Sequence, residues 1–112
     1  MSILTSIKKL LGIAEEDESF DMDIIAHINS VFAILRQLGV GPTAGFAITG
    51  DIETWSQIDS NDQKIAMVKS YMYQKVRLLF DPPTNSSHLQ AMQNSVNEFE
   101  WRLNVAVENT KI

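Results

Sequence analysis

Three stretches of the chain repeat apolar side chains at the period of an α-helix, and this periodicity constrains the fold more than any other feature. The first stripe comprises Ile24, Ile28, Val31, Leu35 and Leu38. The second comprises Ile65, Val68, Met72, Val76 and Leu79, and the third Leu89, Met92, Val96, Phe99 and Leu103. Because each stripe covers one face of a helix, the sequence predicts an all-α fold, a small helical bundle of three long helices.

Glycine and proline mark where two of these helices end. The first is expected to span residues 21–38, because Leu38-Gly39-Val40 is typical of a Schellman stop. Asp81-Pro82-Pro83 ends the second, since the residue before a proline is displaced from helical geometry. Capping-box pairs predict where the second and third helices begin: Ser60 with Gln63, and Ser87 with Gln90.

Shorter elements complete the predicted bundle. Residues 3–11 are expected to form an amphipathic helix that stops at Gly12, followed by an acidic linker over residues 15–18. Four of the five glycines fall within residues 39–50, which predicts a Gly-rich loop with a short extended piece at 46–48. Asp51 is expected to cap a short helix that carries Trp55.

The length of the chain fits one folded unit. At 112 residues, 1–112 is expected to be a single helical domain. Within it, residues 1–19 form the N-terminal helix and acidic linker, and 106–112 a flexible tail, because the end of the chain is mostly polar.

Composition excludes several classes of protein. A formal net charge of −5 has the wrong sign for an ordinary nucleic-acid binder. The absence of cysteine removes disulfides, thiolate metal sites and cysteine nucleophiles, and it fits a reducing cytoplasm. No apolar run approaches 18 residues, so we expect neither a membrane-spanning helix nor a secretory signal.

The chain offers few groups for catalysis or metal binding. His27 and His88 are the only histidines, and Asp23 with His27 supplies just two ligands at helical spacing. The acids of residues 15–23 lack the spacing and central glycine of a calcium loop. We therefore expect no catalytic residues, no cofactor and no metal, and assign these side chains structural or surface roles.

Two further patterns also have simpler interpretations. The glycines of residues 39–50 follow no strand and precede no Gly-Lys-Ser/Thr, so stops and turns explain them better than phosphate binding. The helix after Ser60 is locally basic, with two tyrosines among its positive residues, Lys64, Lys69, Lys75 and Arg77. Helical spacing spreads these charges around the helix, which favours an exposed face with internal ion pairs over nucleic-acid contact.

Four strings in the sequence resemble the small head–tail connector, or adaptor, proteins of tailed bacteriophages, particularly of Gram-positive hosts. These strings are FDMDIIAHINSVF (20–32), QLGVGP (37–42), KVRLLFDPP (75–83) and EFEWRLNV (98–105). The FDPP helix break followed by EFEWRLN is the most specific combination. The resemblance covers roughly residues 20–105.

The resemblance implies a non-enzymatic virion component, present in the host cytoplasm during assembly. Such connectors form a ring, commonly a dodecamer, beneath the portal protein, and offer a platform for the stopper or tail-completion protein. Double-stranded DNA passes through the ring without specific binding, and no membrane is involved. An acidic lining agrees with this role, because it repels phosphate.

A closed ring needs two different contact surfaces on each subunit. Tryptophan and arginine are enriched at interface hot spots, and a small bundle buries two tryptophans with difficulty. We therefore select as candidate partner-binding residues Phe46, Trp55, Trp101 and Arg102. The alternatives are a helical interaction or regulatory module, which the bundle pattern alone permits, and a metal-dependent enzyme.

Overall fold

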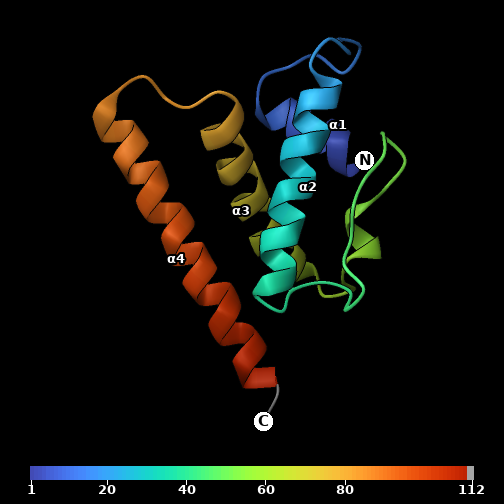
Figure 1. Cartoon of the computed structure of the whole chain (residues 1–112), viewed down its shortest axis with the longest axis vertical. Helices are drawn as coiled ribbons and strands as arrows, with labels where there is room; N and C mark the ends of the chain where they lie inside the picture. Colours follow the sequence, from blue (N-terminus) through green and yellow to red (C-terminus); the bar gives the residue numbers. More distant parts are fainter. Residues whose placement is uncertain (111–112) are drawn as a thin grey trace.

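The computed structural model describes residues 1–110. Its elements are α1 (Ile3–Leu10), α2 (Asp21–Gln37), the 3-10 turn η1 (Trp55–Gln57), α3 (Asp62–Phe80) and α4 (Ser86–Thr110) (Figure 1). The described residues contain no β-strand, although Ser2 and Thr54 form an isolated bridge. The predicted all-α fold, a small helical bundle, is confirmed.

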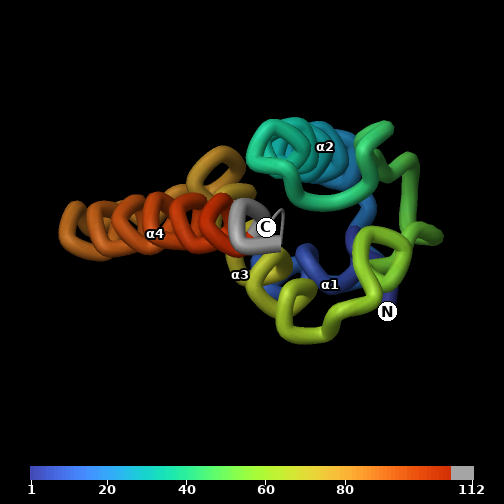
Figure 2. Tube along the Cα trace, turned by 90° about the horizontal axis from the view of Figure 1, so that it is seen from below, coloured from blue at the N-terminus to red at the C-terminus, as the bar shows by residue number. Residues whose placement is uncertain are grey.

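The helix α3 lies at the centre of the bundle and contacts α1, α2 and α4. In Figures 1 and 2, α4 lies on one flank of the α2–α3 pair, whereas the loop after α2 and the segment around η1 lie on the other. The beginning of α4 stands away from the other helices, and its later turns approach them. The molecule is consequently flat, with extents of 44 × 36 × 20 Å.

The core joins all four helices to the loop segment and η1. The side chains with at most 1% exposure are Ile3, Ile7, Ile24, Ile28, Val31, Leu35, Ile48, Val68, Tyr71, Met72, Val76 and Leu103. Burial of apolar surface contributes roughly 25 cal/mol per Å², so these side chains make a large favourable contribution to the free energy of folding.

Parts of the second and third predicted stripes are wrong. Leu79 is 47% exposed, because it lies in the last turn of α3 where the chain leaves the bundle. The helix also buries Tyr71, one of the two tyrosines among its basic residues, which is not part of the predicted stripe. Leu89 and Met92 are only partly buried, because the beginning of α4 stands apart (Figure 1), whereas Val96 and Leu103 are buried.

The predicted helix stops are confirmed. At the end of α1, Gly12 N–H donates to Lys9 O (3.1 Å) and Ile13 N–H to Lys8 O (2.9 Å). The same Schellman pattern recurs at Gly39 after α2, and both glycines have positive φ. The helix α3 ends at Phe80, immediately before Asp81 and the two prolines.

The three predicted N-caps are each displaced. Asn61 rather than Ser60 caps α3, accepting a hydrogen bond from Lys64 N–H (3.1 Å). Asn85 rather than Ser87 lies before α4 and accepts from His88 N–H (3.0 Å). Thr54, not Asp51, caps η1 and forms a capping box with Gln57. Asparagine and threonine provide the same acceptor oxygen as serine or aspartate, so local chemistry alone does not distinguish neighbouring caps.

The loop at 46–48 and the end of α4 are the two remaining segments for which the sequence makes a prediction. Residues 46–48 form no strand and have no regular secondary structure. The helix α4 continues to Thr110, through most of the predicted flexible tail 106–112, because no proline or glycine in residues 106–110 ends it. Residues 111–112 of that tail lie outside the described part of the chain.

Candidate interaction surfaces

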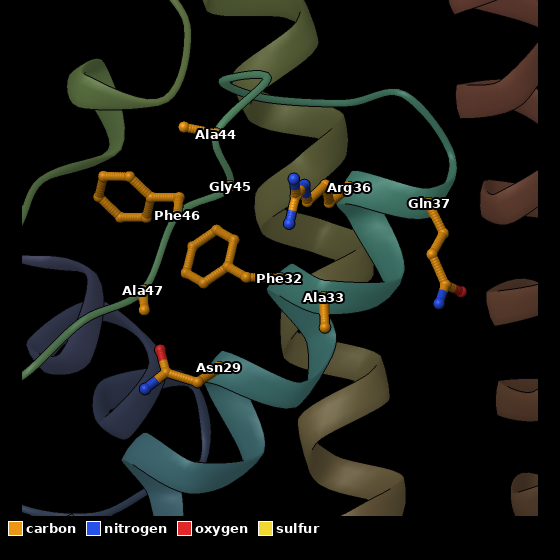
Figure 3. A pocket seen from close by; sticks show the side chains of 9 residues that line it. All are labelled: Asn29, Phe32, Ala33, Arg36, Gln37, Ala44, Gly45, Phe46 and Ala47. Carbon is orange, nitrogen blue, oxygen red and sulfur yellow. The ribbon is translucent and has the colours of Figure 1, made fainter.

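An open groove lies between the second half of α2 and the loop that follows it (Figure 3). We call it the Arg36 groove; its volume is about 680 Å³, and it is lined by Asn29, Phe32, Ala33, Arg36, Gln37, Ala44, Gly45, Phe46 and Ala47. Phe32 and Phe46 meet edge to face with their centroids 5.2 Å apart. The groove thus combines apolar walls with a single charged side chain, that of Arg36.

The loop wall of the Arg36 groove is held in place by α2. Asn29 Oδ1 accepts from Ile48 N–H (2.8 Å), and Asn29 Nδ2 donates to Ile48 O (3.0 Å). Gly45 has φ +89°, and a Cβ there would lie 3.3 Å from Arg36 Cδ, so glycine is needed for the loop to approach this side chain. The groove is therefore preformed in the isolated chain.

A second surface lies on the outward side of α4, and we call it the α4 outer face. It comprises Glu98, Trp101 and Arg102. The side chain of Trp101 is 66% exposed. Arg102 Nη2 lies 2.6 Å from Glu98 Oε1, and both side chains are more than half exposed. At about 100° per residue, Trp101 lies about 160° around the helix from the buried Leu103 and so faces away from α3.

The other predicted contact residue, Trp55, belongs to the core. Its side chain is 7% exposed, and its indole Nε1 donates to the buried Ser6 Oγ (2.8 Å). Lys69 Nζ lies 5.5 Å from the centre of the ring. These contacts satisfy the indole of Trp55 within its own chain, and the ring presents little surface to a partner.

A polar contact joins α4 to α3. The hydroxyl of the fully buried Tyr71 donates to Glu100 Oε2 (2.7 Å), and Lys75 Nζ lies 4.0 Å from the same oxygen. Burial raises the pKa of Tyr71, and the hydrogen bond and the charge of Glu100 raise it further. The tyrosine therefore remains a neutral donor that fixes the position of α4 along α3.

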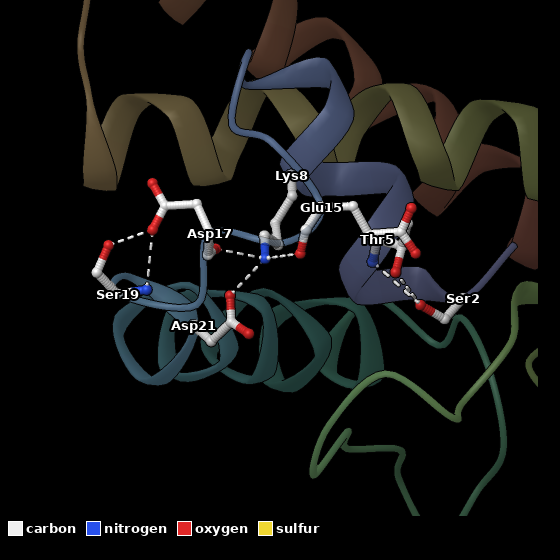
Figure 4. A network of polar contacts seen from close by, with 7 residues as sticks. All are labelled: Ser2, Thr5, Lys8, Glu15, Asp17, Ser19 and Asp21. Atoms are coloured by element: carbon white, nitrogen blue, oxygen red, sulfur yellow. Dashed lines mark hydrogen bonds and ion pairs between the residues drawn. The ribbon is translucent and has the colours of Figure 1, made fainter.

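A buried lysine organises the acidic linker (Figure 4). Lys8 is 3% exposed, and its Nζ donates to Glu15 O (3.0 Å) and Asp17 O (2.7 Å) and pairs with Asp21 Oδ1 (2.8 Å). Hydrogen bonds from the side chain and backbone of Ser19 lower the pKa of Asp17. The linker is therefore tied to α1 and α2, while the side chains of Glu15, Glu16 and Glu18 remain exposed.

The sequence did not reveal the importance of Arg36 and Lys8. Lys8 carries a recognisable signal, because it lies four residues after the buried Leu4, on the apolar face of α1, and just before a run of acids. Arg36 carries none, since its place in the groove depends on a loop whose path depends on tertiary contacts.

The remaining candidate groups do not converge on one site. His27 is half-buried with its ring edge on Phe80 (6.2 Å between centroids), whereas Asp23 and His88 are exposed. Among the side chains that the structure describes, no group of three or more His, Asp or Glu is arranged to hold a metal ion. No helix within residues 1–110 is long and apolar enough to cross a membrane.

Comparison with known proteins identifies the class to which this chain belongs. The model of the phage connector protein family matches residues 3–110, almost the whole chain. No curated protein and no solved structure matches significantly.

The chain therefore belongs to the phage connector protein family. Membership implies a connector role in the virion, together with other virion proteins, and suggests a structural rather than a catalytic function.

Proposed function

We propose that this chain is the head–tail connector, or adaptor, subunit that forms a ring beneath the portal of a tailed bacteriophage. The ring, a dodecamer in this proposal, extends the DNA channel and provides the docking platform for the stopper or tail-completion protein. The observation that carries the proposal is the family match over residues 3–110.

Two features of the molecule support this proposal. The Arg36 groove and the α4 outer face lie on elements at opposite flanks (Figure 2), as the two unlike contacts of a ring subunit require. The net charge of −5 suits a conduit that does not retain DNA, because phosphate is repelled rather than bound by counterion release.

The proposal is tested by measuring the mass of the protein alone and after mixing with the portal protein of the same phage. We expect a stable complex with one connector chain for each portal chain. In parallel, phage lacking the gene should yield DNA-filled heads without tails in electron micrographs. Normal tailed particles from the deletion would refute the connector role, whatever the solution masses show.

A further inference from the structure

The groove beside α2 carries an arginine that pairs with no carboxylate among the side chains that the structure describes. Among the described residues, the ion pairs join Lys8, Lys64, Lys75 and Arg102 to carboxylates, and Arg36 takes part in none. No acidic residue lines the groove, although the chain has 14 acids against nine bases. The preformed Arg36 groove thus presents a cation and the partly exposed ring of Phe46, backed by the buried Phe32, toward an occupant that should be anionic and aromatic.

The α4 outer face offers both an aromatic ring and a carboxylate, the carboxylate being paired with Arg102 of the same chain. It offers a largely exposed indole at Trp101 and, one turn earlier, the exposed carboxylate of Glu98. An arginine over an indole face gains a cation–π interaction, and one paired with a carboxylate gains a charge-assisted hydrogen bond. The ring of Phe46, which packs edge to face on the buried Phe32, can receive a further ring on its accessible side.

The positions of these surfaces favour a second copy of the chain as the occupant. The groove lies on the flank of α2 and its loop, and α4 lies on the opposite flank (Figures 1 and 2). Two unlike patches on opposite flanks of one chain give a head-to-tail contact, which closes into a ring when the rotation between copies allows it. Each copy then contacts one neighbour through its own α4 and the other neighbour through its Arg36 groove.

We propose that the α4 outer face of one subunit packs into the Arg36 groove of the next copy, with Trp101 against Phe46 and Arg36 and with Glu98 paired to Arg36. This inference rests on the proposed ring and specifies the contact that closes it. Glu98 exchanges its partner in the same chain, Arg102, for one in the neighbour, which leaves Arg102 at the edge of the contact.

Disulfide trapping tests the contact, because the chain has no cysteine of its own. The variant Gln37→Cys/Asn97→Cys places one thiol on the groove and one beside the α4 outer face. Phage heads carrying this variant are purified, oxidised and analysed on a non-reducing gel. We expect a ladder of dimers, trimers and longer chains, whereas Ser70→Cys/Asn97→Cys, with its first thiol on an exposed part of α3 outside the groove, gives none.

The outcomes separate the contact from the proposed function. Heads that hold the variant at the wild-type amount but give no ladder, or give an equal ladder with the Ser70 control, overturn the contact and leave the connector role intact. Absence of even the wild-type chain from heads overturns the connector role and the contact with it.

Charge reversal provides an independent test. Arg36→Glu and Glu98→Arg should each reduce the amount of connector in heads at least tenfold, and the double variant should recover most of it. Recovery supports a direct pair, because two separate folding defects would accumulate rather than cancel. Equal loss in the double variant, with each single variant melting as the wild type does, would overturn the Glu98–Arg36 pair.

Discussion

Trp55 and Trp101 are the same residue type, yet the first is 7% exposed and the second 66% exposed. The environment of Trp55 includes a buried hydrogen-bond partner, Ser6 Oγ, at 2.8 Å from the indole nitrogen. Trp101 has no comparable packing, because it faces away from α3. A buried tryptophan stabilises the chain, whereas an exposed one is available for association.

Replacing each tryptophan with phenylalanine separates these roles. Trp55→Phe removes the N–H donor from a buried hydroxyl and leaves a gap, which should lower the free energy of unfolding by about 1–3 kcal/mol. Trp101→Phe should change it by less than about 0.5 kcal/mol, as exposed substitutions do. Urea unfolding monitored by circular dichroism measures both. Equal shifts in midpoint would contradict the assignment of Trp55 to the core.

Lys8 and Lys9 form a second pair of neighbours with different roles. Lys8 is buried and bound to three oxygens, whereas Lys9 is exposed. Lys8→Met retains the length of the side chain but leaves two carbonyls and the Asp21 carboxylate without their cation. The side chain of Asp21 is 25% exposed. We therefore expect the substitution to lower the free energy of unfolding by about 2–3 kcal/mol, less than breaking a fully buried pair does.

The matched control for this prediction is Lys9→Met, which should leave the thermal midpoint nearly unchanged. Limited proteolysis tests this region directly, because the segment between α1 and α2 (residues 11–20), which contains the acidic linker, should be cut faster only in the Lys8 variant. Equal thermal midpoints for the two variants would show that the contacts of Lys8 do not hold the linker in place.

At the scale of elements, the helices could be predicted because their signals are local. The Schellman stops at Gly12 and Gly39 and the Asp81-Pro82-Pro83 break are properties of a few adjacent residues, and all hold in the structure. The caps are displaced by one to three residues, because several neighbouring side chains can supply an acceptor oxygen.

The contacts between elements could not be predicted in the same way. Periodicity places Leu79 on the buried stripe and gives no reason to bury Tyr71, yet the packing of α4 against α3 buries the tyrosine and leaves the leucine half-exposed. Phe46 lies in the segment after α2, but the groove that it forms with Phe32 and Arg36 depends on the Asn29–Ile48 contact across 19 residues. Such long-range pairs leave no signal in a single sequence.

The attachment of α4 gives a prediction at this scale. Tyr71→Phe removes the hydroxyl that donates to Glu100 while retaining the buried ring, which should cost about 1–2 kcal/mol because the bond involves a charged acceptor. Because α4 lies at one edge of the bundle, this substitution should destabilise α4 more than the rest of the chain. Amide hydrogen exchange should therefore become faster in α4 than in α2.

Tyr73→Phe is the control for this substitution. Its hydroxyl only accepts a longer bond from Arg77 Nη1 (3.3 Å) and lies on a partly exposed side of α3. Exchange in α4 should then remain at the wild-type rate. Uniformly faster exchange across all helices in the Tyr71 variant would mean that the contact stabilises the whole bundle rather than α4.

At the scale of the whole molecule, the flat shape separates surfaces that a rounder bundle would merge. With a smallest extent of 20 Å, the chain is little more than two helix layers thick, since packed helices lie about 8–10 Å apart. The α4 flank and the loop flank consequently lie at opposite edges (Figure 2). Because the two surfaces lie at opposite edges, each can contact a different neighbouring copy in a head-to-tail arrangement.

The net charge supplies the last prediction, on the passage of DNA. The exposed side chains of Glu15, Glu16 and Glu18 can be changed without disturbing Lys8, because the lysine binds Glu15 and Asp17 through backbone oxygens. Changing all three to Lys adds two charges each, which takes the chain from −5 to about +1. The wild-type protein should not retain a short DNA duplex at physiological salt. The Lys variant should bind it, with log affinity falling with log salt by about 0.9 for each phosphate contacted.

If these side chains face the channel in the ring, the same Lys variant should slow genome ejection while heads keep their connector and tails. A matched variant with Gln at the three positions removes the repulsion without adding attraction, so it should eject at close to the wild-type rate. Ejection is followed by release of labelled DNA from purified particles, and tail attachment by electron microscopy. Unchanged ejection in the Lys variant would show that this linker lies outside the channel, and retention of duplex DNA by the wild-type chain at physiological salt would refute a repulsive lining altogether.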